Sequence, residues 1–149
     1  METKIETASI KLLDKLCEIE EQCFDREAFT KRQIAYLLMD YNTIALVAKA
    51  NSDIAGFVIA QAEIENNTLY SHIITINVAP DYRRKGIASK MLEEIESIFK
   101  QKGITECHLE VREDNGAALK LYQKTGYQKI GRLEKYYGKN HGLYLKKNL

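Results

Sequence analysis

One segment near the middle of this 149-residue chain limits its fold more than any other. Residues 69–78 form a β-rich run, the single proline Pro80 follows, and an amphipathic pattern starts at Gly86. The apolar positions of that pattern repeat at helical spacing, at Ile87, Ala88, Met91, Leu92, Ile95, Ile98 and Phe99. The segment therefore predicts a strand, a tight turn and a helix in succession. Such a unit is typical of proteins that pack helices on a sheet.

The rest of the chain extends this pattern to an α/β protein, an α+β mixed sheet with helices on its faces. Strands are expected at residues 5–10, 43–50, 54–62, 69–78, 106–112, 127–137 and 142–147. Helices are expected at residues 12–20, 30–38, 87–99 and 115–124, the last with Ala117, Ala118 and Leu121 facing inward. Residues 25–29 are expected to form a loop. The predicted order is β-α-α-β-β-β-α-β-α-β-β in a single domain spanning residues 1–149.

Composition excludes several classes of function. Lys and Arg number 22 against 21 Asp and Glu, a formal charge of +1, which argues against a general nucleic-acid binder. No apolar run approaches the ~20 residues that cross a bilayer, and the polar start is unlike a secretory signal. Cys17, Cys23 and Cys107 are far apart, which indicates reduced thiols in the cytoplasm, with no metal site.

The turn between the central strand and helix is strongly basic. Arg83, Arg84 and Lys85 precede Gly86, where the helix is expected to start. The first amides of a helix lack partners and carry a positive partial charge, so they favour anions. The spacing differs from G-x-x-x-x-G-K-[ST] and from G-x-G-x-x-G, so neither nucleotide-binding loop is indicated. A phosphate-binding turn and an ordinary basic surface turn both remain open.

The same turn resembles a known signature. Arg83–Ala88 is similar to the R/Q-x-x-G-x-G/A motif of the GNAT acetyltransferases. That resemblance implies the GNAT acyl-CoA N-acyltransferase fold and acetyl-CoA as cofactor. It implies that the backbones of Ile76 and Val78, at a bulge in the preceding strand, hold the pantetheine arm and the acetyl carbonyl. It also implies a pyrophosphate cradle made by Arg83, Arg84, Lys85, Gly86, Ile87 and Ala88.

A second stretch, Leu109–Tyr122, resembles the L-E-V-R-x-x-N-x-x-A-x-x-L-Y stretch of ribosomal-protein alanine N-acetyltransferases. The resemblance implies that Glu110 is the general base, Tyr122 donates a proton to the leaving thiolate, and Asn115 binds the pantetheine. Because an ordinary glutamate is a far weaker base than an α-amine, Glu110 would need burial or a bridging water. Each residue also has a structural alternative: Glu110 could lie on a solvated strand face, Tyr122 could be a half-buried aromatic, and Asn115 could be a simple helix cap.

Further candidates surround a predicted acceptor groove. His72 lies at a position where some N-terminal acetyltransferases have a base, although a lone histidine is more often structural. Glu27 lies in a loop that carries a functional glutamate in some of these enzymes. Candidate groove residues are Phe24, Glu27, Phe29, Tyr136 and Tyr137, of which the tyrosines resemble a substrate-holding pair in N-terminal acetyltransferases. For the two phenylalanines, core packing is the alternative.

The resemblance implies an acetyltransferase that moves acetyl from acetyl-CoA to the α-amine of a protein or peptide N-terminus, by direct attack on the thioester. An auxiliary subunit or a homodimer stays open, whereas nucleic-acid and membrane partners are not expected. One alternative acceptor is a small amine such as a polyamine. The other alternative is a non-catalytic acyl-CoA-binding sensor or scaffold subunit.

Overall fold

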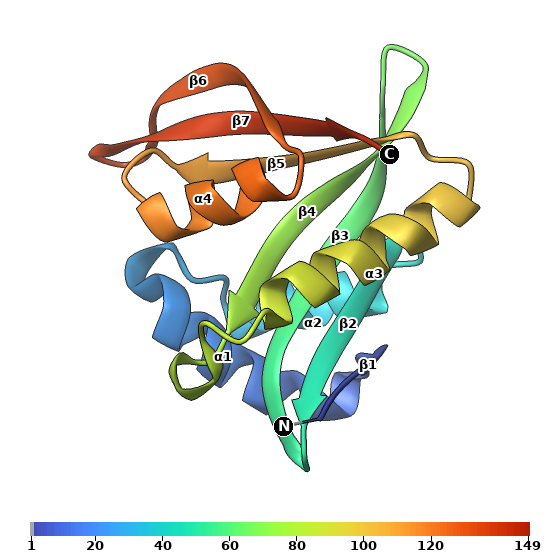
Figure 1. Ribbon diagram of the computed structural model, residues 1–149, viewed down its shortest axis with the longest axis vertical. Coiled ribbons are helices and arrows are strands. Elements are labelled where there is room, and N and C mark those ends of the chain that lie inside the picture. Colours follow the sequence, from blue (N-terminus) through green and yellow to red (C-terminus); the bar gives the residue numbers. More distant parts are fainter. Residues whose placement is uncertain (1) are drawn as a thin grey trace.

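One mixed sheet organises the computed structural model, which describes residues 2–149 (Figure 1). Its strand order is β1-β2-β3-β4-β5-β7-β6. The strands are β1 (Thr3–Thr7), β2 (Thr43–Ala50), β3 (Asp53–Glu65), β4 (Thr68–Val78), β5 (Glu106–Arg112), β6 (Gln128–Tyr137) and β7 (Asn140–Asn148). The helices are α1 (Leu13–Phe24), α2 (Lys31–Met39), α3 (Ile87–Gln101) and α4 (Gly116–Lys124). The predicted fold class and element order are confirmed.

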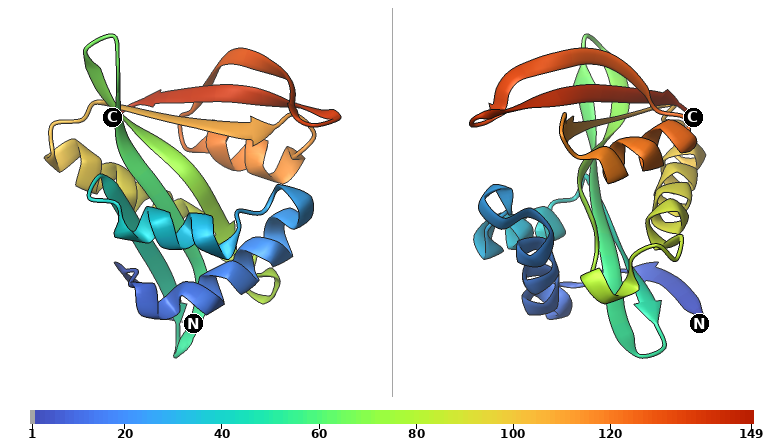
Figure 2. Two further views of the ribbon diagram at one scale, coloured as in Figure 1. Left: turned by 180° about the vertical axis from the view of Figure 1, so that it is seen from behind. Right: turned by 60° about the vertical axis from the view of Figure 1, so that its left-hand side comes forward.

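Helices cover both faces of the sheet (Figure 2). On one face α3 buries an apolar stripe that includes Met91, Ile95 and Phe99 against β2, β3 and β4, and α4 joins the same core through Tyr122. On the other face α1 and α2 enclose a second core around Leu16. Burial of each large apolar side chain contributes about 1.5–3 kcal/mol, so these two cores stabilise most of the fold. None of the helices within residues 2–149 is long and apolar enough to cross a membrane.

Three local expectations are wrong. The first strand runs over Thr3–Thr7, because the chain beyond it turns into a short 3₁₀ helix at Ile10–Leu12. Another 3₁₀ turn, Asp25–Glu27, occupies the first three residues of the loop expected at residues 25–29. Ala117 is exposed, because α4 is rotated so that Tyr122 is buried and its neighbour Leu121 is partly buried.

The feature that positions the site is the separation of β4 from β5. These strands are parallel and pair at Ser71–Cys107 and His72–His108, and then diverge (Figure 1). The β3–β4 register shifts at the same level: Ile59 pairs with Thr75 and Ala60 with Ile73, which leaves Ile74 as a bulge residue. Bulges bend a strand and increase its twist. The sheet therefore opens in its middle, and the bulge lies two residues before Ile76, the first of the two residues at which the resemblance implied it.

Candidate active site

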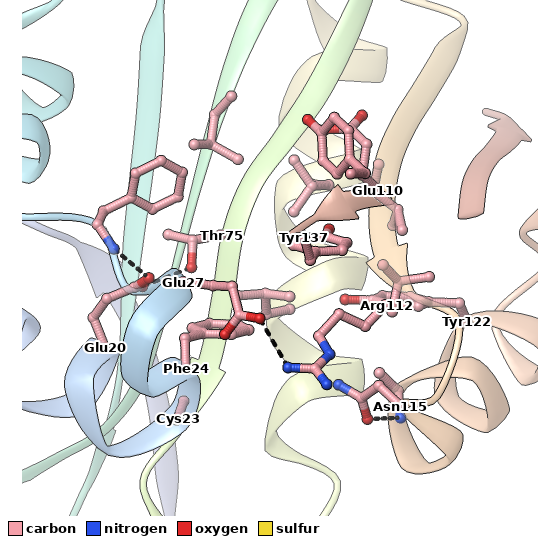
Figure 3. Close-up of a pocket in the computed structure, with 18 of the residues that line it drawn as sticks. Glu20, Cys23, Phe24, Glu27, Thr75, Glu110, Arg112, Asn115, Tyr122 and Tyr137 are labelled. Carbon is pink, nitrogen blue, oxygen red and sulfur yellow. Dashed lines mark hydrogen bonds and ion pairs between the residues drawn. The ribbon is translucent and has the colours of Figure 1, made fainter. Parts of the chain in front are cut away.

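A cavity of about 440 Å³ fills the opening between β4 and β5 (Figure 3). Its walls come from five parts of the chain: the end of α1 with the following loop, the two strands, the start of α4, and the end of β6. Predicted site residues that line it are Phe24, Glu27, Phe29, Ile76, Glu110, Asn115, Tyr122, Tyr136 and Tyr137. The fold thus brings together candidates that lie far apart in the sequence.

The alternation of β5 separates two kinds of group along this cavity. Leu109 and Val111 point into the core shared with α3, and Tyr122 of α4 belongs to that same core. Glu110, between them, faces the opposite side, where its carboxylate contacts His72 and lies 3.5 Å from the hydroxyl of Tyr136. Since successive side chains of a strand point to opposite faces, Glu110 and Tyr122 approach the opening from opposite sides of the sheet.

His72 lies between two carboxylates. Its Nδ1 is 2.8 Å from Oε2 of Glu63 on β3, and its Nε2 is 2.8 Å and 2.9 Å from the two oxygens of Glu110. Burial alone would lower the pKa of His72, but the hydrogen bonds and charges of Glu110 and Glu63 outweigh it and raise that pKa. His72 does not line the cavity itself, and it reaches the cavity through Glu110.

Tyr122 is nearly fully buried, and its ring packs edge-on against Tyr127 at 5.7 Å. Burial, together with the neighbouring Tyr137 and Cys107, raises the pKa of Tyr122 well above its usual value. The phenol therefore keeps its proton at neutral pH. Asn115 is the N-cap of α4, since its Oδ1 accepts a hydrogen bond from the amide of Ala118 at 3.2 Å. The capping alternative for Asn115 is confirmed, and its side chain also reaches the cavity.

Aromatic side chains from the α1–α2 region and from the end of β6 form opposite walls of the cavity. Phe24 and Phe29 flank it on the α1–α2 side, and Tyr136 and Tyr137 flank it on the β6–β7 side, stacked edge-on at 4.9 Å. These are the residues that the sequence placed around an acceptor groove, and their roles there stay predictions.

An ion pair that the sequence did not suggest joins the two sides. Arg112 Nη1 at the end of β5 is 2.8 Å from Oε1 of Glu27 (Figure 3). The same guanidinium donates to both oxygens of Asp114. Glu27 is thus engaged by a cation from across the opening. Arg112 stood inside the recognised motif without an assigned role, so the motif was the signal that could have found it.

A buried carboxylate fixes the α1–α2 side. Glu20 is 1% exposed and accepts hydrogen bonds from Thr75 Oγ1 at 2.7 Å, Asn77 Nδ2 at 2.9 Å and the Phe29 amide at 3.1 Å. It therefore ties the loop after α1 to the bulged strand. The signal for Glu20 was its place on the apolar face of the first helix, where a charged residue needs partners.

The basic turn lies beyond the cavity, where β4 ends and α3 begins. Arg84 and Gly86 have left-handed backbones, with φ of 62° and 77°. Such turns direct successive amides to one side and make concavities that bind anions. Arg83, Arg84, Lys85 and Gly86 are all exposed, and the side chain of Arg83 folds back to donate to the carbonyl of Val78 at 3.2 Å. Val78, Ile87 and Ala88 likewise lie outside the lining of the cavity.

The fold and this site define an acyl-transferring protein of a known class. The family model described as "Acetyltransferase (GNAT) family" matches residues 11–127, and the chain belongs to that family. N-alpha-acetyltransferase 30 of Schizosaccharomyces pombe is 28% identical over 130 residues, which cover 87% of this chain and 86% of the relative. The [ribosomal protein bS18]-alanine N-acetyltransferase of Escherichia coli K12 is 33% identical over 92 residues, which cover 62% of this chain and 60% of the relative.

A solved structure has the same fold. One chain in the crystal structure of the NatC complex bound to Gag peptide and CoA has a TM-score of 0.90 at 22% identity, and the match covers 100% of this chain and 99% of that one. The predicted membership of the GNAT family is confirmed.

Proposed function

We propose that this protein transfers an acetyl group from acetyl-CoA to the α-amine of a protein or peptide N-terminus. The observation that carries the proposal is the cavity between β4 and β5, with Glu110 on one side of the sheet and Tyr122 on the other. An amine can approach from the side of the cavity lined by Phe24, Phe29, Tyr136 and Tyr137, while a thioester enters from the α3–α4 side. Relatives named as N-alpha-acetyltransferases support this acceptor class.

The turn before α3 fits the diphosphate of acetyl-CoA. The space around Gly86 is open, and a Cβ built there meets no atom within 4 Å. Arg84 and Lys85 stand exposed beside it, so their charges are available to an anion. In the proposal the amides of Gly86, Ile87 and Ala88 bind the diphosphate, while Asn115 and the backbones of Ile76 and Val78 hold the pantetheine arm.

Reversing the charge at Arg84 is expected to weaken acetyl-CoA binding by about tenfold, since one favourable contact with a diphosphate becomes repulsive. Isothermal titration calorimetry of Arg84→Glu against acetyl-CoA measures this. Lys100→Glu, an exposed residue at the other end of α3, is the matched control and is expected to keep the wild-type Kd. Equal Kd values for the two variants would remove Arg84 from the binding site.

The chain's chemical task is to manage protons. The transfer joins the amine nitrogen to the acetyl carbon and releases the thiol, and an ammonium acceptor loses two protons in the process. One proton goes to the Glu110–His72 pair, directly or through water, and the other ends on the sulfur. Because burial disfavours a tyrosinate, Tyr122 contributes a hydrogen bond to the developing thiolate rather than full ionisation.

A small polyamine is a weaker candidate acceptor. A polycation favours a groove with several free carboxylates, and three glutamates do line the cavity. However, Glu20 is held by Thr75, Asn77 and an amide, and Glu27 is held by Arg112. The groove is therefore mostly aromatic beside Glu110, which suits an extended peptide.

Mass spectrometry of acetyl-CoA reactions tests the acceptor class. Peptides with free N-termini, the same peptides with blocked N-termini, and spermidine are compared at equal concentration. The proposal predicts product with the free peptides alone. Product with spermidine alone would favour the small-amine alternative, and tight acetyl-CoA binding without any product would favour a sensor.

We also propose that the protein acts in the cytoplasm. Cys17, Cys23 and Cys107 are free thiols in the structure, which fits a reducing compartment. The near-neutral charge offers no general attraction to nucleic acid. In this proposal a protein or peptide N-terminus is the acceptor substrate. The protein could act with an auxiliary subunit or as a homodimer.

A further inference from the structure

Behind Glu110 and His72 lies a further carboxylate, Glu63, which the sequence did not single out. Glu63 lies on β3, opposite Tyr70 in the β3–β4 register, and its Oε1 accepts the Tyr70 hydroxyl at 2.9 Å. Its other oxygen, Oε2, is 2.8 Å from Nδ1 of His72. Glu63 is about one-third exposed, whereas Glu110 is 15% exposed. The three groups form a line from solvent to the cavity: Glu63, then His72, then Glu110.

Counting protons shows what this line requires. A neutral imidazole has one N–H and donates to one carboxylate only. Both ring nitrogens of His72 face carboxylate oxygens at 2.8 Å, so each contact needs a hydrogen. The two contacts therefore need two protons, whereas a neutral histidine carries only one. Two protons at these contacts fit an imidazolium between two carboxylates, in keeping with the hydrogen bonds and charges of Glu110 and Glu63 that raise the pKa of His72.

The other groups around His72 do not compete for this proton. Burial lowers the pKa of His108 on β5 and raises the pKa of Tyr70, Tyr136 and Tyr144, so all four are uncharged near neutral pH. Glu106 on β5 pairs with Lys146 of β7. The charge on His72 is therefore set by its two direct partners, Glu63 and Glu110.

We propose that Glu63 is a positioning residue that holds His72 in its charged, two-proton state and so sets the pH above which the Glu110–His72 pair accepts the acceptor amine's proton. The inference rests on the proposed acetyl transfer for its second half. When the pair has lost one proton to solvent, it takes one from the ammonium and returns to the two-proton state. Removing the charge of Glu63 leaves Glu110 in place but weakens the hold on the imidazolium.

The substitution Glu63→Gln tests the inference, with Glu65→Gln as the matched control. Glu65 lies two residues along the same strand, on the same face, and is exposed. The substitution Glu65→Gln therefore removes the same charge from a residue that has no contact with His72. Glu63→Asp keeps the charge but shortens the side chain, and its behaviour is expected to lie between wild type and Glu63→Gln. Because Glu63 is partly exposed, all three variants are expected to fold, which circular dichroism checks.

The first readout is an NMR titration of the His72 ring in the free protein, without acetyl-CoA or peptide. Glu63→Gln is expected to lower the pKa of His72, because the negative charge of Glu63, which raises that pKa, is removed. Glu65→Gln is expected to change it less. An unchanged titration in Glu63→Gln, or an equal decrease in both variants, would overturn the inference.

The second readout is the pH profile of kcat/KM. The acid limb of Glu63→Gln is expected to move to lower pH, so that near the foot of the wild-type limb its activity is about a threefold larger fraction of its own plateau. The plateau should fall far less than the ~10²–10⁴-fold contributed by an acid–base group, because Glu110 and His72 remain. A plateau loss of that size with no shift of the limb would overturn the inference. If no acceptor is acetylated at any pH, the proposed function fails, and the NMR titration still decides the role of Glu63.

Discussion

Glu110→Gln is expected to lower kcat by about 10²–10³-fold while leaving the Kd for acetyl-CoA close to that of the wild type. The carboxylate is the group that faces both the cavity and His72, and an amide cannot take a proton from the acceptor. The turn before α3, where the diphosphate is proposed to bind, lies on other elements, so the substitution is expected to leave it unchanged. Steady-state kinetics with an acetylated peptide, and calorimetry with acetyl-CoA, measure the two quantities separately.

Glu113→Gln is the matched control for this loss. Glu113 directly follows β5, is exposed, and pairs with Arg132 outside the cavity. The control removes the same charge only three residues away, and wild-type turnover is expected. If Glu110→Gln keeps the wild-type kcat at pH 7, Glu110 is not the base, and the solvated-strand alternative is the better account of it.

Glu20→Ala is expected to lower the free energy of unfolding by about 3–5 kcal/mol, or roughly 10 °C in Tm. The substitution leaves three donors without their acceptor: the Thr75 hydroxyl, the Asn77 amide and the Phe29 backbone N–H. It also frees the loop that carries Phe24 and Phe29, so KM for the peptide is expected to rise. Denaturant unfolding and steady-state kinetics check the two effects.

Glu21→Ala separates the buried network from the general loss of a helix glutamate. Glu21 is the next residue of α1 and is exposed, so its removal is expected to change stability by less than about 0.5 kcal/mol. Equal losses in the two variants would mean that the hydrogen bonds of Glu20 contribute little. A large stability loss with an unchanged peptide KM would mean that the loop does not contact the acceptor.

Local patterns were sufficient to predict most of the fold. The helical spacing after Gly86 marks the start of α3. Thr30 and Gln33 form a capping box at the start of α2, and Asn51, Asn66 and Asn67 adopt left-handed backbones in the turns between strands. All of these features are local in the sequence. The expectation failed at Ala117, since the rotation of a short helix depends on its tertiary neighbours. Two small alanines beside a leucine and a tyrosine do not reveal which side will be buried.

The site was predictable where a motif carried it and not where three-dimensional contact created it. Glu110 and Tyr122 belong to one recognised stretch. His72 is 38 residues from Glu110, and only the short parallel pairing of β4 with β5 brings them into contact. Glu63 meets His72 through the β3–β4 register, which the bulge shifts. No spacing in the sequence reports such cross-strand pairs.

The most direct test of the account is a crystal structure with a conjugate that joins a short peptide's α-amine to coenzyme A. We expect the diphosphate against the amides of Gly86 and Ile87, the sulfur in the opening between β4 and β5 near Tyr122, and the peptide between Phe29 and Tyr137. A conjugate bound with its diphosphate away from Gly86, or with its peptide outside that opening, would contradict the account.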